Sequence, residues 1–138
     1  MSLTRIYLPL NAARLRELSA ERCLLGSPYA AHAVTDMLRA VSPGTDEEER
    51  EYLALTDAAE SSRALLGPGE RRRIVAAADV EASWLCEGAS TAGSSVTITA
   101  DVPLKRIASI HVDDADAAVD DELLWYDATE LPVILELL

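Results

Sequence analysis

One short apolar segment constrains the fold of this chain more than any other feature of the sequence. Residues 74–78 read Ile-Val-Ala-Ala-Ala, with Arg71-Arg72-Arg73 before them and Asp79 after them. An uninterrupted apolar run bounded by charges is typical of a central strand that is covered on both faces. The small alanines would allow helices to approach such a strand closely. The segment therefore predicts a sheet with helices packed on it.

Further strands and helices are expected along the chain. Residues 96–102 alternate apolar and polar side chains, as in a half-buried strand, and strands are also expected at 5–8, 107–112 and 123–126. Helices are expected at 12–21, about 36–41, 46–66 and the C-terminal end, with Asn11, Thr35, Thr45 and Thr129 as their caps. In the longest helix, a period of 3.6 residues predicts a buried face made of Tyr52, Leu55, Ala59 and Leu66.

The length of the chain limits it to one core. A chain of 138 residues, 49% of them apolar, buries enough surface for one hydrophobic core and too little for two. The expectation is a single α/β domain over residues 1–138, with a mixed sheet of four to five strands packed by about four helices. The order of the strands stays open.

Charge is distributed unevenly along the chain. The net charge is −12, and residues 74–138 contain thirteen Asp or Glu against two Lys or Arg. The acidic segment 113–130 contains eight carboxylates and no basic residue: Asp113, Asp114, Asp116, Asp120, Asp121, Glu122, Asp127 and Glu130. Such a field repels phosphate groups, so no nucleic-acid partner is expected.

Motifs for membranes, export, metals and cofactors are lacking in the sequence. No stretch approaches the about 20 apolar residues of a membrane span, and the first 20 residues do not resemble an export signal. Cys23 and Cys86 are far apart, and free thiols in a reducing, cytoplasmic compartment are expected. Because neither histidine has the spacing of a zinc motif, we expect no metal and no cofactor.

Two groups of polar residues could carry chemistry. On the 107–112 strand, alternation places Ser109, His111 and Asp113 on one face, where His111 could reach Asp113 and, with favourable bending of the side chains, Ser109. Asp79 ends the 74–78 strand, and Asp113-Asp114 end the 107–112 strand. In parallel neighbours these carboxylates would converge and could hold a divalent cation, whereas in antiparallel neighbours they would lie at opposite edges. Asp at a strand end is also a common turn residue.

Two aromatic residues lie within the acidic segment. Trp125 and Tyr126 follow Leu123-Leu124, and aromatic rings beside carboxylates suit an interface with a partner that carries arginine. Packing in the core is the alternative for Trp125. His32, near Ala30-Ala31, is interpreted as a packing residue.

Six stretches together resemble one protein family: RIYLP (5–9), AVT (33–35), EYLAL (51–55), RRIVAAADV (72–80), IHVDD (110–114) and ELLWY (122–126). The resemblance is to a family of short actinobacterial conserved hypothetical proteins, described as a domain of unknown function, whose members have a longer acidic segment before Leu-Trp-Tyr. It implies no activity for any residue.

Two functions are consistent with these observations. The first is a non-enzymatic interaction protein whose acidic segment 113–130, with Trp125 and Tyr126, meets a basic partner surface or a second copy of the chain. The alternative is a small hydrolase or divalent-cation-dependent enzyme that uses Asp79, His111, Asp113 and Asp114.

Overall fold

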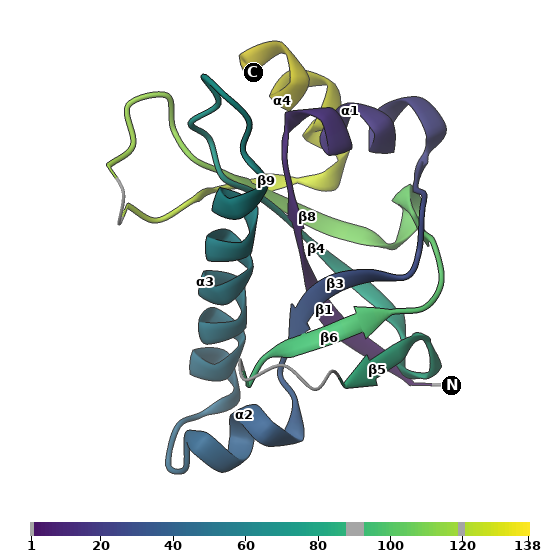
Figure 1. Cartoon of the computed structure of the whole chain (residues 1–138), viewed down its shortest axis with the longest axis vertical. Coiled ribbons are helices and arrows are strands. Elements are labelled where there is room, and N and C mark those ends of the chain that lie inside the picture. The colour runs from purple at the N-terminus through teal and green to yellow at the C-terminus, as the bar shows by residue number, and fades with distance from the viewer. Residues whose placement is uncertain (1, 88–92, 119–120) are drawn as a thin grey trace.

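Seven antiparallel strands form the main sheet of this protein. The structure, a computed structural model, describes residues 2–87, 93–118 and 121–138. The order of strands is β5-β6-β3-β1-β4-β8-β9, and β2 pairs with β7 in a separate two-stranded sheet. The strands are β1 (Leu3–Leu10), β2 (Cys23–Leu24), β3 (Tyr29–Ala33), β4 (Ile74–Glu81), β5 (Leu85–Glu87), β6 (Ser95–Ile98), β7 (Val102–Pro103), β8 (Ile107–Val112) and β9 (Leu124–Asp127). Figure 1 shows the sheet crossing the middle of the molecule.

The α/β class is confirmed, but the details of the predicted sheet are wrong. The main sheet has seven strands in place of four to five, and each strand pairing among the described residues is antiparallel. The prediction missed β3, which reads Tyr-Ala-Ala-His-Ala and lacks a clear alternation of apolar and polar residues. The 96–102 strand stops at Ile98, and Val102 belongs to the second sheet.

Four α-helices are present: α1 (Ala12–Glu21), α2 (Asp36–Val41), α3 (Glu47–Leu65) and α4 (Leu131–Leu137). Asn11 caps α1 by accepting a hydrogen bond from the Arg14 amide, and Thr35 caps α2 in the same way, both as predicted. Two predicted caps are wrong. Asp46, one residue after Thr45, accepts from the Glu49 amide and caps α3. Before α4, the Asp127 carboxylate caps a short 3₁₀ turn by accepting from the Thr129 amide.

Strand β4 has a hydrophobic core on each face, as its apolar run predicted. On one face Ile6, Leu8 and Ile74 pack with residues of α1 and α4. On the other face Val75 and Ala77 pack with Ala54, Ala58 and Ala59 of α3. The predicted buried face of the long helix is therefore only partly correct. Ala59 is buried and Leu55 packs against this core, but small residues make up most of the side that contacts the sheet, and Tyr52 is 52% exposed.

Helix α3 covers only part of its face of the sheet, and the edge strand β9 lies outside the covered part. The helix packs on β1, β3 and β4, while β8 and then β9 continue the sheet beyond it. The chain between β8 and β9 passes beside one end of α3 before it returns to the sheet edge (Figure 1). This placement brings the acidic segment next to the exposed side of α3.

Candidate functional site

The strand-end carboxylates do not converge. Strands β4 and β8 run antiparallel, with Ile74 opposite Val112, so Asp79 lies at one end of the strand pair and Asp113 and Asp114 at the other. The Asp79 carboxylate accepts hydrogen bonds from Arg5 Nε at 2.7 Å and Arg5 Nη2 at 3.0 Å. A divalent-cation site built from these three carboxylates is therefore ruled out by the strand direction. No group of three His, Cys, Asp or Glu residues within the described part of the chain is arranged to hold a metal ion.

Asp113 is part of a buried ion pair. Its carboxylate accepts from Arg73 Nε at 2.7 Å, from Arg73 Nη2 at 2.8 Å and from the Arg73 backbone amide at 2.9 Å. Ser109 Oγ and His111 Nε2 do lie 3.0 Å apart, as the alternation allowed. Burial and the charge of Arg5 lower the pKa of His111. The predicted grouping of Ser109, His111 and Asp113 thus reduces to a Ser–His pair, because Asp113 is bound to arginine.

Several carboxylates of the acidic segment have structural partners. Asp127 and Glu130 form a capping box at the turn before α4, and Asp113 belongs to the ion pair with Arg73. Asp120 lies outside the described residues. Four others are exposed to solvent: Asp114, Asp116, Asp121 and Glu122. The free acidic surface is therefore smaller than the sequence suggested.

The acidic segment and α3 enclose a small hollow. This hollow, called the Tyr52 hollow below, has a volume of about 210 Å³. It is lined by Tyr52, Leu55, Thr56, Ala59, Glu60, Arg73, Asp121, Glu122 and Leu123. The Tyr52 hydroxyl donates to Glu122 Oε1 at 3.3 Å across it. Arg73 lies within this Tyr52 hollow, but Asp113 neutralises its charge. The hollow thus combines an aromatic ring with three carboxylates.

A second hollow continues the acidic lining along α3. Its volume is about 610 Å³, and Thr45, Asp46, Glu48, Glu49, Tyr52 and Leu53 line it. Tyr52 is therefore shared by both hollows. The two hollows form one acidic surface with Tyr52 at its centre.

Trp125 is exposed to solvent, so the core-packing alternative for this residue is wrong. Its side chain is 63% exposed, and that of Leu124 is 44% exposed. Trp125 lies opposite His111, which lies opposite Val75, so the indole is on the face of the sheet that α3 covers. Tyr126 points to the opposite face and packs against the core there. Of the two predicted aromatic residues, Trp125 exposes its ring to solvent and Tyr126 packs against the core.

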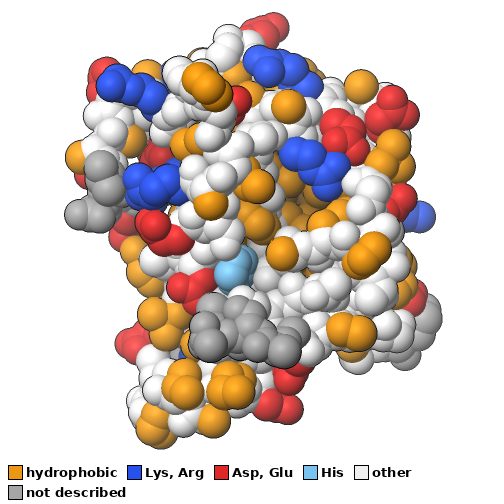
Figure 2. Space-filling model, viewed as in Figure 1, with side chains coloured by type: hydrophobic (Ala, Val, Ile, Leu, Met, Phe, Trp, Pro, Cys, Tyr) orange, Lys and Arg blue, Asp and Glu red, His pale blue; other side chains and the backbone are white. Residues whose placement is uncertain are grey.

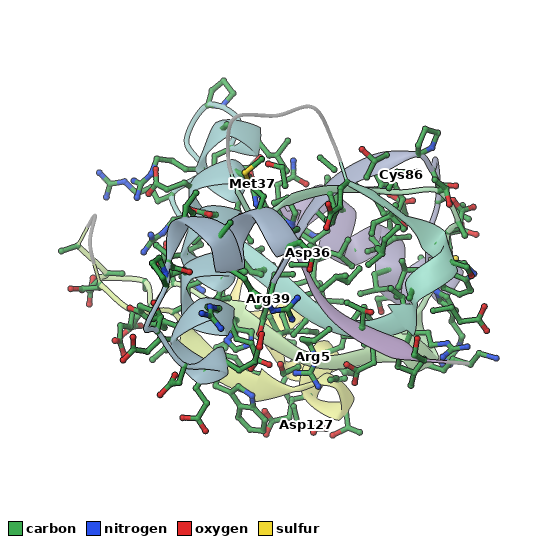
Figure 3. The ribbon with its side chains drawn as sticks, turned by 90° about the horizontal axis from the view of Figure 1, so that it is seen from below. Arg5, Asp36, Met37, Arg39, Cys86 and Asp127 are labelled. Atoms are coloured by element: carbon green, nitrogen blue, oxygen red, sulfur yellow. The ribbon has the colours of Figure 1, made fainter. Side chains whose placement is uncertain are left out.

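Figure 3 shows Arg5 and Asp127 near each other on one side of the molecule. The strand registers place Arg5, Asp79, Ser109 and Asp127 on the same face as Trp125. Asp79, His111 and Trp125 from the predicted set therefore share one face. Tyr126 points to the other face, and Asp113 and Asp114 follow the end of β8.

The sequence reasoning missed Tyr52 as a candidate binding residue. The 3.6-residue period assigned Tyr52 to the buried side of its helix, together with Leu55 and Ala59. Ala54 and Ala58, spaced four residues apart, were the signal for the actual buried face, because small residues mark close packing of a helix on a sheet. That face turns Tyr52 towards the acidic segment.

Comparisons with known proteins give a family and no activity. The model of DUF6912, a family of unknown function, matches residues 4–120. No curated protein and no solved structure matches the chain. Within the described residues, no helix has both the length and the apolar character needed to cross a membrane. The predicted resemblance to a domain of unknown function is confirmed.

Proposed function

The chain belongs to this family of unknown function, and we propose that it is an interaction protein that binds an arginine-containing segment of a basic partner protein. The binding surface, called the acidic face below, is made of Glu48, Tyr52, Glu60, Asp121, Glu122 and Trp125. The observation that carries the proposal is the Tyr52 hollow, where a ring and carboxylates from two separate segments line one cavity.

The chemistry of the hollow matches a guanidinium group. Arginine stacks on aromatic faces and forms directed hydrogen bonds to carboxylates, and Tyr52 and Glu122 offer both kinds of contact. Trp, Tyr and Arg are the residues that most often dominate the energy of an interface. The exposed ring of Trp125 would add apolar contact beside the arginine.

The charge of the surface favours a basic partner over a second copy. Two copies that met through the acidic face would bring the carboxylates of Glu48, Asp121 and Glu122 against each other. Like charges placed opposite each other at an interface cost several kcal/mol. The same field disfavours nucleic acid.

Both cysteines are free thiols, which supports the proposal that the protein acts in the reducing cytoplasm.

A peptide titration followed by NMR tests the proposal. The probe is a peptide of alternating arginine and alanine, and the reference is the same peptide with neutral citrulline in place of arginine. We expect the arginine peptide to shift the indole signal of Trp125 and leave that of Trp84 unchanged. Raising the salt concentration should weaken binding, because screening reduces attraction between exposed charges.

Charge-matched variants separate a site from a general field. Glu122→Gln removes a carboxylate of the Tyr52 hollow, and Glu136→Gln removes one from α4 with the same change in net charge. Binding should fall at least fivefold in Glu122→Gln and Tyr52→Ala and stay within twofold in Glu136→Gln. Equal losses in the two glutamine variants, or equal binding of the citrulline peptide, would show that no arginine site exists.

A further inference from the structure

A chain of hydrogen bonds connects α3 to the centre of the sheet. His32 on β3 is 6% exposed, and both of its ring nitrogens are engaged. Nε2 lies 2.7 Å from Ser61 Oγ, and Nδ1 lies 2.8 Å from Ser94 Oγ. The Ser94 hydroxyl donates to Asp57 Oδ2 at 2.6 Å. Asp57 and Ser61 are four residues apart on α3, so both side chains join this hydrogen-bond network from the same face of the helix.

The Asp57 carboxylate determines which group donates and which accepts in each hydrogen bond of this network. An ionised carboxylate only accepts hydrogen bonds, so the hydroxyl proton of Ser94 is used on Asp57. Ser94 Oγ must then accept from Nδ1–H of His32. Nε2 is left without a proton and accepts the hydroxyl proton of Ser61. Burial lowers the pKa of His32, although Asp57 opposes the shift, so the ring is held neutral with its lone pair on Ser61.

Ser61 also lines an apolar groove. The groove has a volume of about 380 Å³, and Leu10, Arg14, Leu24, Tyr29, Ser61 and Leu65 are among the residues that line it. It lies where β1 and β3 diverge, because within the described chain these strands pair at Ile6–Ala33 and Tyr7–His32 and separate beyond. Figure 2 shows hydrophobic side chains recessed on this face. A hydroxyl with a base thus faces a cavity of a size that holds a small apolar group.

We infer that Ser61 is the nucleophile of an ester-hydrolysing site, with His32 as its general base and the groove as the binding site for the apolar acyl group of a carboxylic ester. The serine, the imidazole and the acyl cavity come from α3, β3 and the gap beside β1. Ser94 and Asp57 are positioning residues, because they orient the imidazole and stabilise its protonated form. The inference is independent of the acidic face.

The proposed reaction has two steps, acylation of Ser61 and hydrolysis of the acyl-serine ester. Ser61 Oγ forms a bond to the carbonyl carbon while its proton moves to His32 Nε2. The bond from that carbon to the leaving alcohol oxygen then breaks, and the alcohol takes the proton from Nε2. Water attacks the acyl-Ser61 ester with the same base, which releases the carboxylic acid and restores the Ser61 hydroxyl.

A second Ser–His pair in the molecule serves as the comparison. Ser109 Oγ lies 3.0 Å from His111 Nε2, but Ser109 is 5% exposed. Asp113, the nearest carboxylate along that strand, is bound to Arg73. A Ser–His contact alone therefore does not distinguish the two sites. The site of Ser61 differs because the His32 ring is oriented through Ser94 and Asp57 and because Ser61 lines the groove. Ser109→Ala is the matched control for Ser61→Ala.

The experiment uses the full chain with an alkyl fluorophosphonate, which phosphonylates activated serines with loss of fluoride, and with p-nitrophenyl butyrate as the ester. We expect one adduct, mapped by mass spectrometry to Ser61, and release of p-nitrophenol that is lost in Ser61→Ala and retained in Ser109→Ala. A general base contributes about 100-fold or more to the rate, so His32→Ala should lose about that factor. Added imidazole should restore part of the loss, which a purely structural role of His32 would not allow.

Asp57→Asn tests the relay without removing the serine or the base. The amide can place a donor towards Ser94, which reverses the hydrogen bonds and puts the proton on Nε2, so labelling of Ser61 should fall at least tenfold. An unlabelled native chain, an adduct on Ser109, or equal labelling rates in the native and Asp57→Asn chains would overturn the inference. The mapping on the native chain decides the matter even if a variant fails to fold.

Discussion

The Arg73 guanidinium and the Asp113 carboxylate form a two-point ion pair, at 2.7 and 2.8 Å, with both side chains almost completely buried. The pair links the start of β4 to the end of β8, and Arg73 Nη2 also donates to the Asp121 carbonyl at 2.8 Å. Arg73 therefore fixes both ends of the chain between Asp113 and Asp121. Arg73 thus helps to hold the acidic segment beside α3, together with the hydrogen bond from Tyr52 to Glu122.

Removal of the Asp113 carboxylate should destabilise the fold strongly. In Asp113→Ala the guanidinium of Arg73 would stay buried without its anion, and breaking one side of a buried pair costs about 3–5 kcal/mol in the free energy of unfolding. Asp114→Ala is the control, because Asp114 is the exposed neighbour and its loss should change stability by no more than about 0.5 kcal/mol. Urea unfolding measures both. Equal stability of the two variants would contradict the assigned role of the pair.

Ser62 should contribute to stability far more than an ordinary helix serine. Its hydroxyl is fully buried, donates to the Leu10 carbonyl at 2.6 Å and accepts from the Ile74 amide at 2.9 Å, so it bridges the ends of β1 and β4. Ser62→Ala would leave two buried backbone groups without this partner and should cost about 1–3 kcal/mol. The control is Thr56→Ala on the exposed side of the same helix. A loss of stability no greater than that of Thr56→Ala would exclude the bridge.

The sequence predicted local features well and long-range pairings poorly. Asn11 and Thr35 were correct caps, because a cap depends on residues within one turn, and Thr45 missed the cap of its helix by one residue. The apolar run at 74–78 correctly predicted a strand buried on both faces. The direction of β4 relative to β8 could not be read in this way, since it depends on which distant segments pair. The carboxylate site, which required parallel strands, is therefore not formed. His32, Ser61 and Ser94 are brought together from three elements, and no local spacing indicates that contact.

Stability should fall as the pH is lowered through the ordinary histidine range. Burial lowers the pKa of His32 and of His111 below 6.5, with Asp57 opposing the shift at His32 and Arg5 adding to it at His111. Just below pH 6.5 the unfolded chain therefore binds protons that the folded chain does not, so the free energy of unfolding decreases with decreasing pH until the lower folded pKa is reached.

Each histidine can contribute up to about 1.4 kcal/mol per pH unit in that window. Urea unfolding between pH 7.5 and 5.5 measures the slope in the native chain and in His111→Gln, which lacks one of the two groups. The variant should show a shallower slope than the native chain. Identical slopes, or a stability that does not change over this range, would show that the two imidazoles are not held neutral by burial.

Trp125 and Tyr126 should respond to substitution in opposite ways, although they are neighbours on β9. Tyr126 packs against the core, so Tyr126→Ala should lower the free energy of unfolding by about 2 kcal/mol. The Trp125 side chain is 63% exposed, and Trp125→Ala should change stability by less than about 0.5 kcal/mol while it weakens binding of the arginine peptide at least fivefold. Thermal unfolding and the NMR titration separate the two effects. A Trp125→Ala chain that is destabilised as much as Tyr126→Ala would mean that the indole supports the sheet edge, and an undisturbed affinity would remove Trp125 from the acidic face.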